Sequence, residues 1–143
     1  MGFENKNMLP FVPDMYSGVW WKVYVTPVQK PRMTQCDKWK KRNCVLNYYS
    51  FKDNLKLYFG NETLLPKNIT ICSWIAYLPF PKSYSEKKRY ELSGCPHTLK
   101  PDKDNIEKAI FDSLFTKDQF IYAGFGIKYW EDSQGPRLEL LFK

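Results

Sequence analysis

One stretch of the sequence restricts the possible folds more than any other, the apolar run at residues 68–78. Successive side chains of a strand point to opposite faces, and in this run both faces carry apolar groups such as Ile71, Ile75, Trp74 and Leu78. A strand that is apolar on both faces needs cover on both, so the run predicts a central strand of a sheet. The prolines at 79 and 81 end it.

Three further segments have the composition of strands. Residues 18–27, 119–130 and 137–142 are rich in β-branched and aromatic side chains, and turn residues separate the last two. We expect 119–130 and 137–142 to form a hairpin, with Gly124 and Gly126 loosening the first strand at a bulge.

Two segments have helical periodicity. Apolar residues recur at steps of three to five over residues 38–59, and the period returns after residue 104 with Ile106, Ala109, Ile110 and Leu114 on one face. This order of elements predicts an α+β fold, with a mixed four-stranded sheet and two main helices packed on one face. The length predicts a single domain over residues 1–143, and prolines make residues 1–17 an irregular N-terminal arm.

The composition favours a polyanionic partner. The chain carries a net charge of +7 and has a pI near 9.2. Charge alone does not separate nucleic acid from an anionic membrane surface. No run of eighteen apolar residues predicts a membrane span, and no signal peptide is recognisable, so we expect a cytoplasmic protein.

The cysteines do not form a metal-binding pattern. No Cys-x-x-Cys pair occurs among the four of them, and His97 is the single histidine, for which we expect a structural role. Glycosylation sequons at Asn61 and Asn68 leave open the alternative that the protein is secreted and disulfide-bonded. Without a signal peptide we expect reduced thiols, with Cys44 and Cys72 in the core.

The segment Lys100–Lys108 contains the candidate catalytic residues. Asp104 is a good N-cap with Glu107 placed for a capping box, and Asp102 stands just before the helix. Crowded carboxylates suit Mg²⁺, which takes oxygen ligands together with a substrate phosphate and water. Lys108, one turn on, can hold a phosphate. The plainer alternative is that these aspartates are only caps and surface charges.

Residues 96–114 resemble the signature of the RusA family of Holliday-junction resolvases, whose core reads lysine-proline-aspartate-x-aspartate-asparagine-x-x-lysine. Residues 30–34 resemble the family's early proline-arginine segment, 81–89 its basic loop, and 117–119 its later acidic pair. The resemblance covers roughly residues 20–142, although only the central motif is specific.

The resemblance implies a small homodimeric, Mg²⁺-dependent endonuclease, with Mn²⁺ as a substitute, that cuts four-way DNA junctions symmetrically. It assigns Asp102, Asp104 and Asp118 as metal ligands and Lys108 as the site lysine. Where the family has two adjacent aspartates, this chain has Lys117 and Asp118. We expect Asp118 to meet the other two where the second helix begins. The family also implies a cytoplasmic protein of bacterial or phage origin with no membrane partner.

Basic residues near this motif are candidates for DNA contact. They are Arg32, Lys82, Lys87, Lys88, Arg89 and Lys100. Tyrosines between them suit stacking on bases, and the lysines suit phosphate contacts. Lys38, Lys40, Lys41 and Arg42 oppose the dipole of the first helix, which is also consistent with phosphate binding. The alternative function is a non-catalytic, basic nucleic-acid-binding module.

Overall fold

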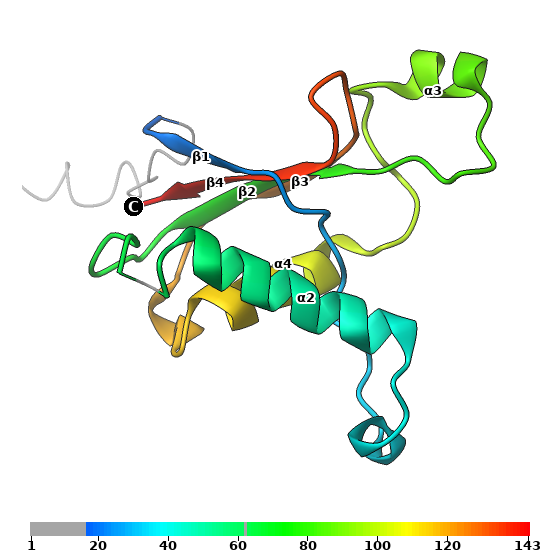
Figure 1. The fold of residues 1–143 in the computed structure, drawn as a ribbon. Coiled ribbons are helices and arrows are strands. Elements are labelled where there is room, and N and C mark those ends of the chain that lie inside the picture. The colour runs from blue at the N-terminus through cyan, green and yellow to red at the C-terminus, as the bar shows by residue number, and fades with distance from the viewer. Residues whose placement is uncertain (1–16, 62) are drawn as a thin grey trace, which may run out of the picture.

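The computed structural model describes residues 17–61 and 63–143, so the expected N-terminal arm lies outside the described residues except for Ser17. Its strands are β1 (Trp20–Val23), β2 (Cys72–Leu78), β3 (Gly126–Trp130) and β4 (Arg137–Phe142). Its α-helices are α2 (Asn43–Tyr58), α3 (Glu86–Leu92) and α4 (Lys103–Leu114), with short 3-10 helices η1 (Gln35–Lys38) and η2 (Asp118–Phe120). The fold is α+β, as expected. Figure 1 shows α2 and α4 together beneath the sheet and α3 standing away from both layers.

The four strands form one mixed sheet in the order β1-β4-β2-β3. β2 lies inside the sheet, antiparallel to β4 and parallel to β3, which confirms the central strand predicted from its two apolar faces. The predicted hairpin of the last two strands is wrong, because β2 separates β3 from β4. Parallel pairing needs a crossover connection, and α4 lies in that connection.

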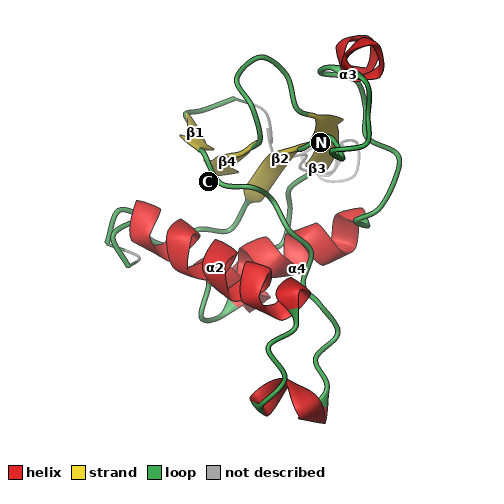
Figure 2. Ribbon diagram, turned by 45° about the vertical axis from the view of Figure 1, so that its right-hand side comes forward, coloured by secondary structure: helices red, strands yellow, loops and turns green. Residues whose placement is uncertain are grey.

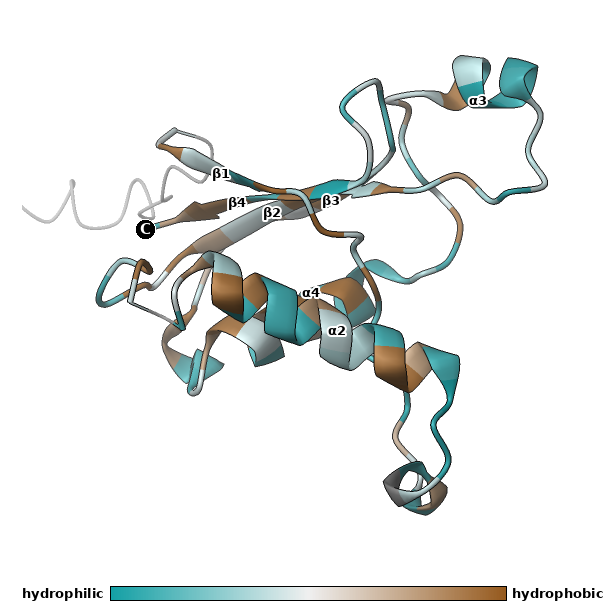
Figure 3. Cartoon of the chain, viewed as in Figure 1, coloured by the Kyte–Doolittle hydropathy of each residue, from teal (hydrophilic) through white to brown (hydrophobic). Residues whose placement is uncertain are grey.

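One hydrophobic core joins the sheet to the two main helices. Tyr48, Phe51 and Leu55 of α2 and Ile106, Ala109, Ile110 and Leu114 of α4 are buried in it, together with Trp74 and Leu140 of the sheet. This confirms two helices packed on one face. In Figure 3 hydrophobic colour covers the C-terminal part of β4 and recurs along both helices, whereas α3 is mostly hydrophilic.

The first helix is shorter than its periodicity predicted. α2 begins at Asn43, so the basic cluster precedes the helix instead of forming its first turn. Arg42 binds Asp37 through two hydrogen bonds of 2.7 and 2.8 Å, and this guanidinium holds the pKa of Asp37 well below its usual range.

Only one of the two cysteines expected in the core lies there. Cys44 is exposed, so that prediction is wrong, whereas Cys72 is 1% exposed and burial raises the pKa of its thiol. All four cysteines are free thiols.

The strand predicted at residues 119–130 begins only at Gly126. Gly124 has a φ of +146°, and a Cβ there would collide with the carbonyl group of Cys72. A Cβ on Gly126 would collide with the Trp74 indole. Both glycines therefore let this segment approach β2 closely. Among the described residues, no helix is both long and apolar enough to cross a lipid bilayer.

Candidate active site

The N-terminus of α4 places two carboxylates at the surface. Asp102 is the N-cap residue, so the prediction of Asp104 as the cap is wrong, and Asp104 lies in the first turn. The capping box is also absent within the described residues, since the Glu107 carboxylate accepts a hydrogen bond of 3.1 Å from the buried Trp74 indole. The Asp102 side chain makes no capping hydrogen bond within this part of the chain. Its oxygens are therefore available to a ligand.

Lys108 lies one helical turn beyond Asp104 on the same side of α4. Its Nζ is 3.7 Å from Asp104 Oδ2, and the two side chains are 62% and 70% exposed. An ion pair this open to water contributes little to stability. Both groups can exchange their mutual contact for a charged ligand.

A basic groove runs beside these residues. Lys30, Pro31 and Arg32 line a hollow of about 420 Å³ with Asn105 and Lys108. The segment is fixed to α4 because the Lys30 amide donates a 3.0 Å hydrogen bond to the Asn105 carbonyl. Arg32, predicted from sequence to bind DNA, therefore shares a groove with the site lysine.

Asp112 anchors the same segment at its other side. Its carboxylate lies 2.6 Å from Lys30 Nζ and accepts a 3.2 Å hydrogen bond from the Tyr48 hydroxyl. Burial and the charge of Asp112 raise the pKa of Tyr48, so the hydroxyl remains a donor. Asp112 therefore holds the groove together.

The remaining predicted DNA contacts lie on the segment 79–100, here called the basic loop, which carries α3 away from the sheet and helices (Figures 1 and 2). Lys82, Lys87, Lys88 and Lys100 are exposed on it. Lys88 Nζ lies 3.8 Å from the centre of the Tyr84 ring. Arg89 instead donates hydrogen bonds to the carbonyls of Tyr84 and Pro81, at 3.1 and 3.2 Å, and so braces the loop.

Lys128 is a positioning residue that the sequence did not reveal. From β3, its Nζ donates to the carbonyls of Leu99 at 2.6 Å and Pro101 at 2.8 Å. These bonds fix the chain directly before Asp102. The sequence around this single lysine in an apolar strand does not predict which carbonyl groups it binds, because the contact depends on the tertiary fold.

Asp118 does not join the other two aspartates within one chain. It is exposed in η2, which follows the C-terminal end of α4, whereas Asp102 caps the opposite end (Figure 1). The 12 residues of α4 span about 18 Å at 1.5 Å per residue. Over residues 17–61 and 63–143, no three His, Cys, Asp or Glu side chains form a group that could hold a metal ion. The assignment of the three aspartates as metal ligands remains a prediction.

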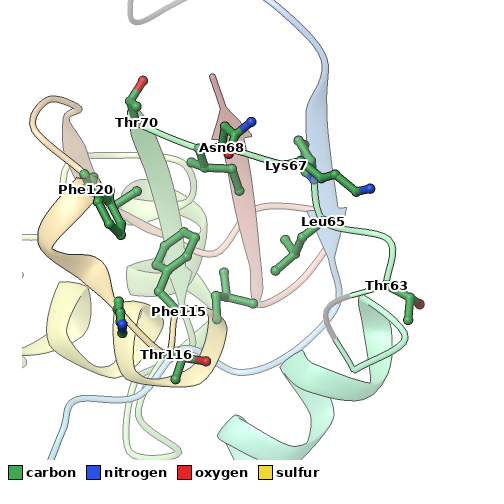
Figure 4. A pocket seen from close by; sticks show the side chains of 13 residues that line it. Thr63, Leu65, Lys67, Asn68, Thr70, Phe115, Thr116 and Phe120 are labelled. Carbon is green, nitrogen blue, oxygen red and sulfur yellow. The ribbon is translucent and has the colours of Figure 1, made fainter.

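A larger hollow lies at that opposite end of α4. It has a volume of about 630 Å³ and is lined by Leu65, Ile69, Thr70, Phe115 and Phe120, among others, with Lys67 and Lys117 as its charged residues (Figure 4). No carboxylate belongs to its described lining. It is therefore an apolar pocket separate from the acidic site.

Comparison with known proteins identifies a family. The model of one protein family, described as endodeoxyribonuclease RusA, matches residues 24–140. The match includes Arg32, the basic loop, the N-terminus of α4 and Asp118. No curated protein matches the chain significantly. Since the matched region is most of the sequence, the chain belongs to the RusA family of endodeoxyribonucleases.

Proposed function

We propose that this protein is a divalent-metal-dependent endonuclease that cleaves branched DNA, with the four-way junction as its substrate. The observation that carries the proposal is the N-terminus of α4, where Asp102 and Asp104 stand beside a groove lined by Lys30, Arg32 and Lys108. A site with carboxylates and cations side by side suits a phosphodiester, because the cations attract phosphate while the carboxylates hold a metal. Membership of the RusA family supports the same reaction.

The residues at the helix start fit Mg²⁺, or Mn²⁺ as its substitute. Mg²⁺ is usually bound through one or two carboxylates and a substrate phosphate, and it keeps several waters. Asp102 makes no capping bond within the described residues, and Asp104 has an exposed lysine 3.7 Å away. When bound, the metal would polarise the phosphodiester and lower the pKa of a bound water.

The protein's own residues bind and orient the DNA in this proposal. Lys108 and Arg32 hold phosphate oxygens through charge-assisted hydrogen bonds, which are stronger than neutral ones. Lys128 keeps the chain before Asp102 in place through the carbonyls of Leu99 and Pro101. The exposed lysines of the basic loop follow the DNA backbone, so binding should weaken steeply with salt.

Symmetric cleavage follows from a homodimer. Two copies related by a two-fold axis present identical sites to the two equivalent strands of a four-way junction. The dimer also gives Asp118 a role, because α4 separates it from Asp102 within one chain. A second copy can bring its Asp118 to the helix start of the first and complete the carboxylate set.

The proposal is tested with the substitution Asp104→Asn, which keeps the size of the side chain and removes its charge. We expect cleavage of a synthetic four-way junction in Mg²⁺ to slow by more than about 100-fold, above the range for residues that only support a metal ligand. Binding of the junction should be retained. Asp53→Asn, at an exposed position of α2, is the matched control and should cleave normally.

The same assay distinguishes the nuclease from the alternative function. Wild-type protein that binds junctions but never nicks them in Mg²⁺ or Mn²⁺ would be a non-catalytic binding module. Unchanged cleavage by Asp104→Asn would show that the chemistry lies elsewhere on the chain.

A further inference from the structure

A further, smaller pocket lies between the basic loop and the N-terminus of α4. Its volume is about 250 Å³, and Tyr84, His97 and Trp130 line it together with several prolines. Lys100 and Pro101 complete the wall, and the next residue is Asp102. The pocket therefore adjoins the carboxylates, although it was not part of the site expected from sequence.

The aromatic rings that line this pocket pack against one another. Trp130 is 5% exposed and stacks on Phe80 with ring centres 5.2 Å apart and planes 12° apart. The rings of His97 and Tyr84 lie 4.1 and 5.7 Å from the Trp130 ring. Protein surfaces of this kind, with π-faces beside lysines, are the ones on which single nucleobases stack.

His97 adds an unsatisfied polar group. The residue is 6% exposed, and its Nδ1 has no hydrogen-bond partner among the described residues. A buried polar atom without a partner costs free energy, and such atoms are rare. A ligand that combines a flat aromatic face with a polar edge would fill the pocket beside the His97 ring. A nucleobase has both features.

The pocket also has the right place and charge for a base of the bound DNA. Lys128 fixes the carbonyls of Leu99 and Pro101, so the wall shared with Asp102 is held in position. Lys88 lies over the Tyr84 ring at 3.8 Å and brings a positive charge beside the pocket. A phosphodiester held at Asp102 would place its neighbouring base near this opening.

We propose that the pocket formed by Tyr84, His97 and Trp130 binds one unpaired nucleobase next to the phosphodiester that is cleaved. The inference rests on the proposed function. It adds that the protein contacts a base of the DNA as well as its phosphates. Phosphate contacts carry no sequence information, whereas a base pocket does. Bases at a branch point or mismatch cost less to unpair than bases within a duplex, so the pocket favours cleavage there.

The test measures coupling between the base and the Tyr84 ring, without cleavage. Four-way junctions are prepared with one mismatched pair at successive positions around the branch point, so that the base is already unpaired. Each is compared with the same junction in which that base is replaced by an abasic site. Affinities are measured in EDTA for wild type, Tyr84→Ala, Tyr84→Phe and His97→Asn, with Tyr49→Ala on an exposed position of α2 as the control.

We expect wild type to bind the base-carrying junction about tenfold more tightly than the abasic one at a single position, as for one stacked base. Tyr84→Phe and Tyr49→Ala should keep this preference, Tyr84→Ala should lose it, and His97→Asn should reduce it. Tyr84→Leu replaces Tyr84→Ala if thermal unfolding shows that the alanine variant is not folded.

Two results would overturn the inference: no position with a preference in wild type, or a preference that survives removal of the Tyr84 ring. Because the measurement needs no metal, failure of the nuclease proposal is recognised separately, as absent cleavage with the base preference intact.

Discussion

The two ends of helix α4 differ in almost every property that matters for a ligand. At its N-terminus, Asp102, Asp104 and Lys108 are exposed beside a small basic groove. At its C-terminus, Phe115 and Phe120 face a larger pocket of about 630 Å³ that is mainly apolar (Figure 4). Size alone would therefore select the opposite end from the one that we propose as the nuclease site.

Electrostatics explains why the smaller hollow suits DNA. A helix carries a partial positive charge at its N-terminus and a partial negative charge at its C-terminus. In this proposal the helix dipole adds to the positive charges of Lys108 and Arg32 in attracting phosphate to the N-terminal end. The proposed site was therefore chosen by charge and side-chain chemistry instead of cavity volume.

Asp118 is the predicted metal ligand that does not fit this division between the two ends, because it lies beyond the C-terminus of α4. We expect Asp118→Asn to slow junction cleavage by more than about 100-fold, as for Asp104→Asn, if a second copy supplies it to the site. Co-expressing Asp104→Asn and Asp118→Asn chains with different tags then yields a mixed dimer. One of its two sites is intact, so nicking of the junction should return to about half the wild-type rate.

Other outcomes of this experiment are equally informative. Full activity of Asp118→Asn would remove the residue from the metal site. An inactive mixed dimer made from two inactive parents would mean that each chain completes its own site, so residues 115–118 would have to move toward Asp102 when DNA and metal bind.

A substitution of Lys108 tests whether the positive charge at the N-terminal end contributes to cleavage. Replacing it with methionine keeps the length of the side chain and removes one charge-assisted hydrogen bond, worth about 1.5–3 kcal/mol. At 1.36 kcal/mol per tenfold change in rate, cleavage should slow by about 10- to 100-fold. Lys22→Met is the matched control, because Lys22 also lies beside a carboxylate, 3.9 Å from Glu139, but on β1. Equal rate losses in the two variants would exclude a specific role for Lys108.

Much of the fold followed from local patterns. The central position of β2 was predicted because both its faces are apolar, and the buried face of α4 because Ile106, Ala109 and Ile110 follow the helical period. The proximity of Asp102, Asp104 and Lys108 was equally accessible, since residues within two turns of one helix stay close in any fold. Motifs confined to one element are therefore predictable from sequence.

The wrong predictions concern features that tertiary contacts determine. Glu107 suits a capping box, but the Trp74 indole takes its carboxylate as a hydrogen-bond acceptor. The last two strands look like a hairpin, but β3 pairs with β2 through close contacts at Gly124 and Gly126. The expected approach of Asp118 to Asp102 depended on the length and direction of α4 relative to the sheet.

The smallest expected effect concerns His97, which lies on the segment leading to the N-terminal end of α4. Burial, and then the charge of Lys128, lower the pKa of His97 below its usual value near 6.5. Below about pH 6.5 the unfolded chain therefore takes up a proton that the folded chain resists, so the free energy of unfolding falls as the pH falls toward the folded-state pKa. Urea unfolding at pH 7.5, 6.5 and 5.5 should show a larger loss of stability for wild type than for His97→Gln, which cannot titrate. Parallel pH dependences for the two proteins would mean that His97 is protonated as easily in the folded chain as in the unfolded one, and the pocket beside Asp102 would then be more open to water than its burial indicates.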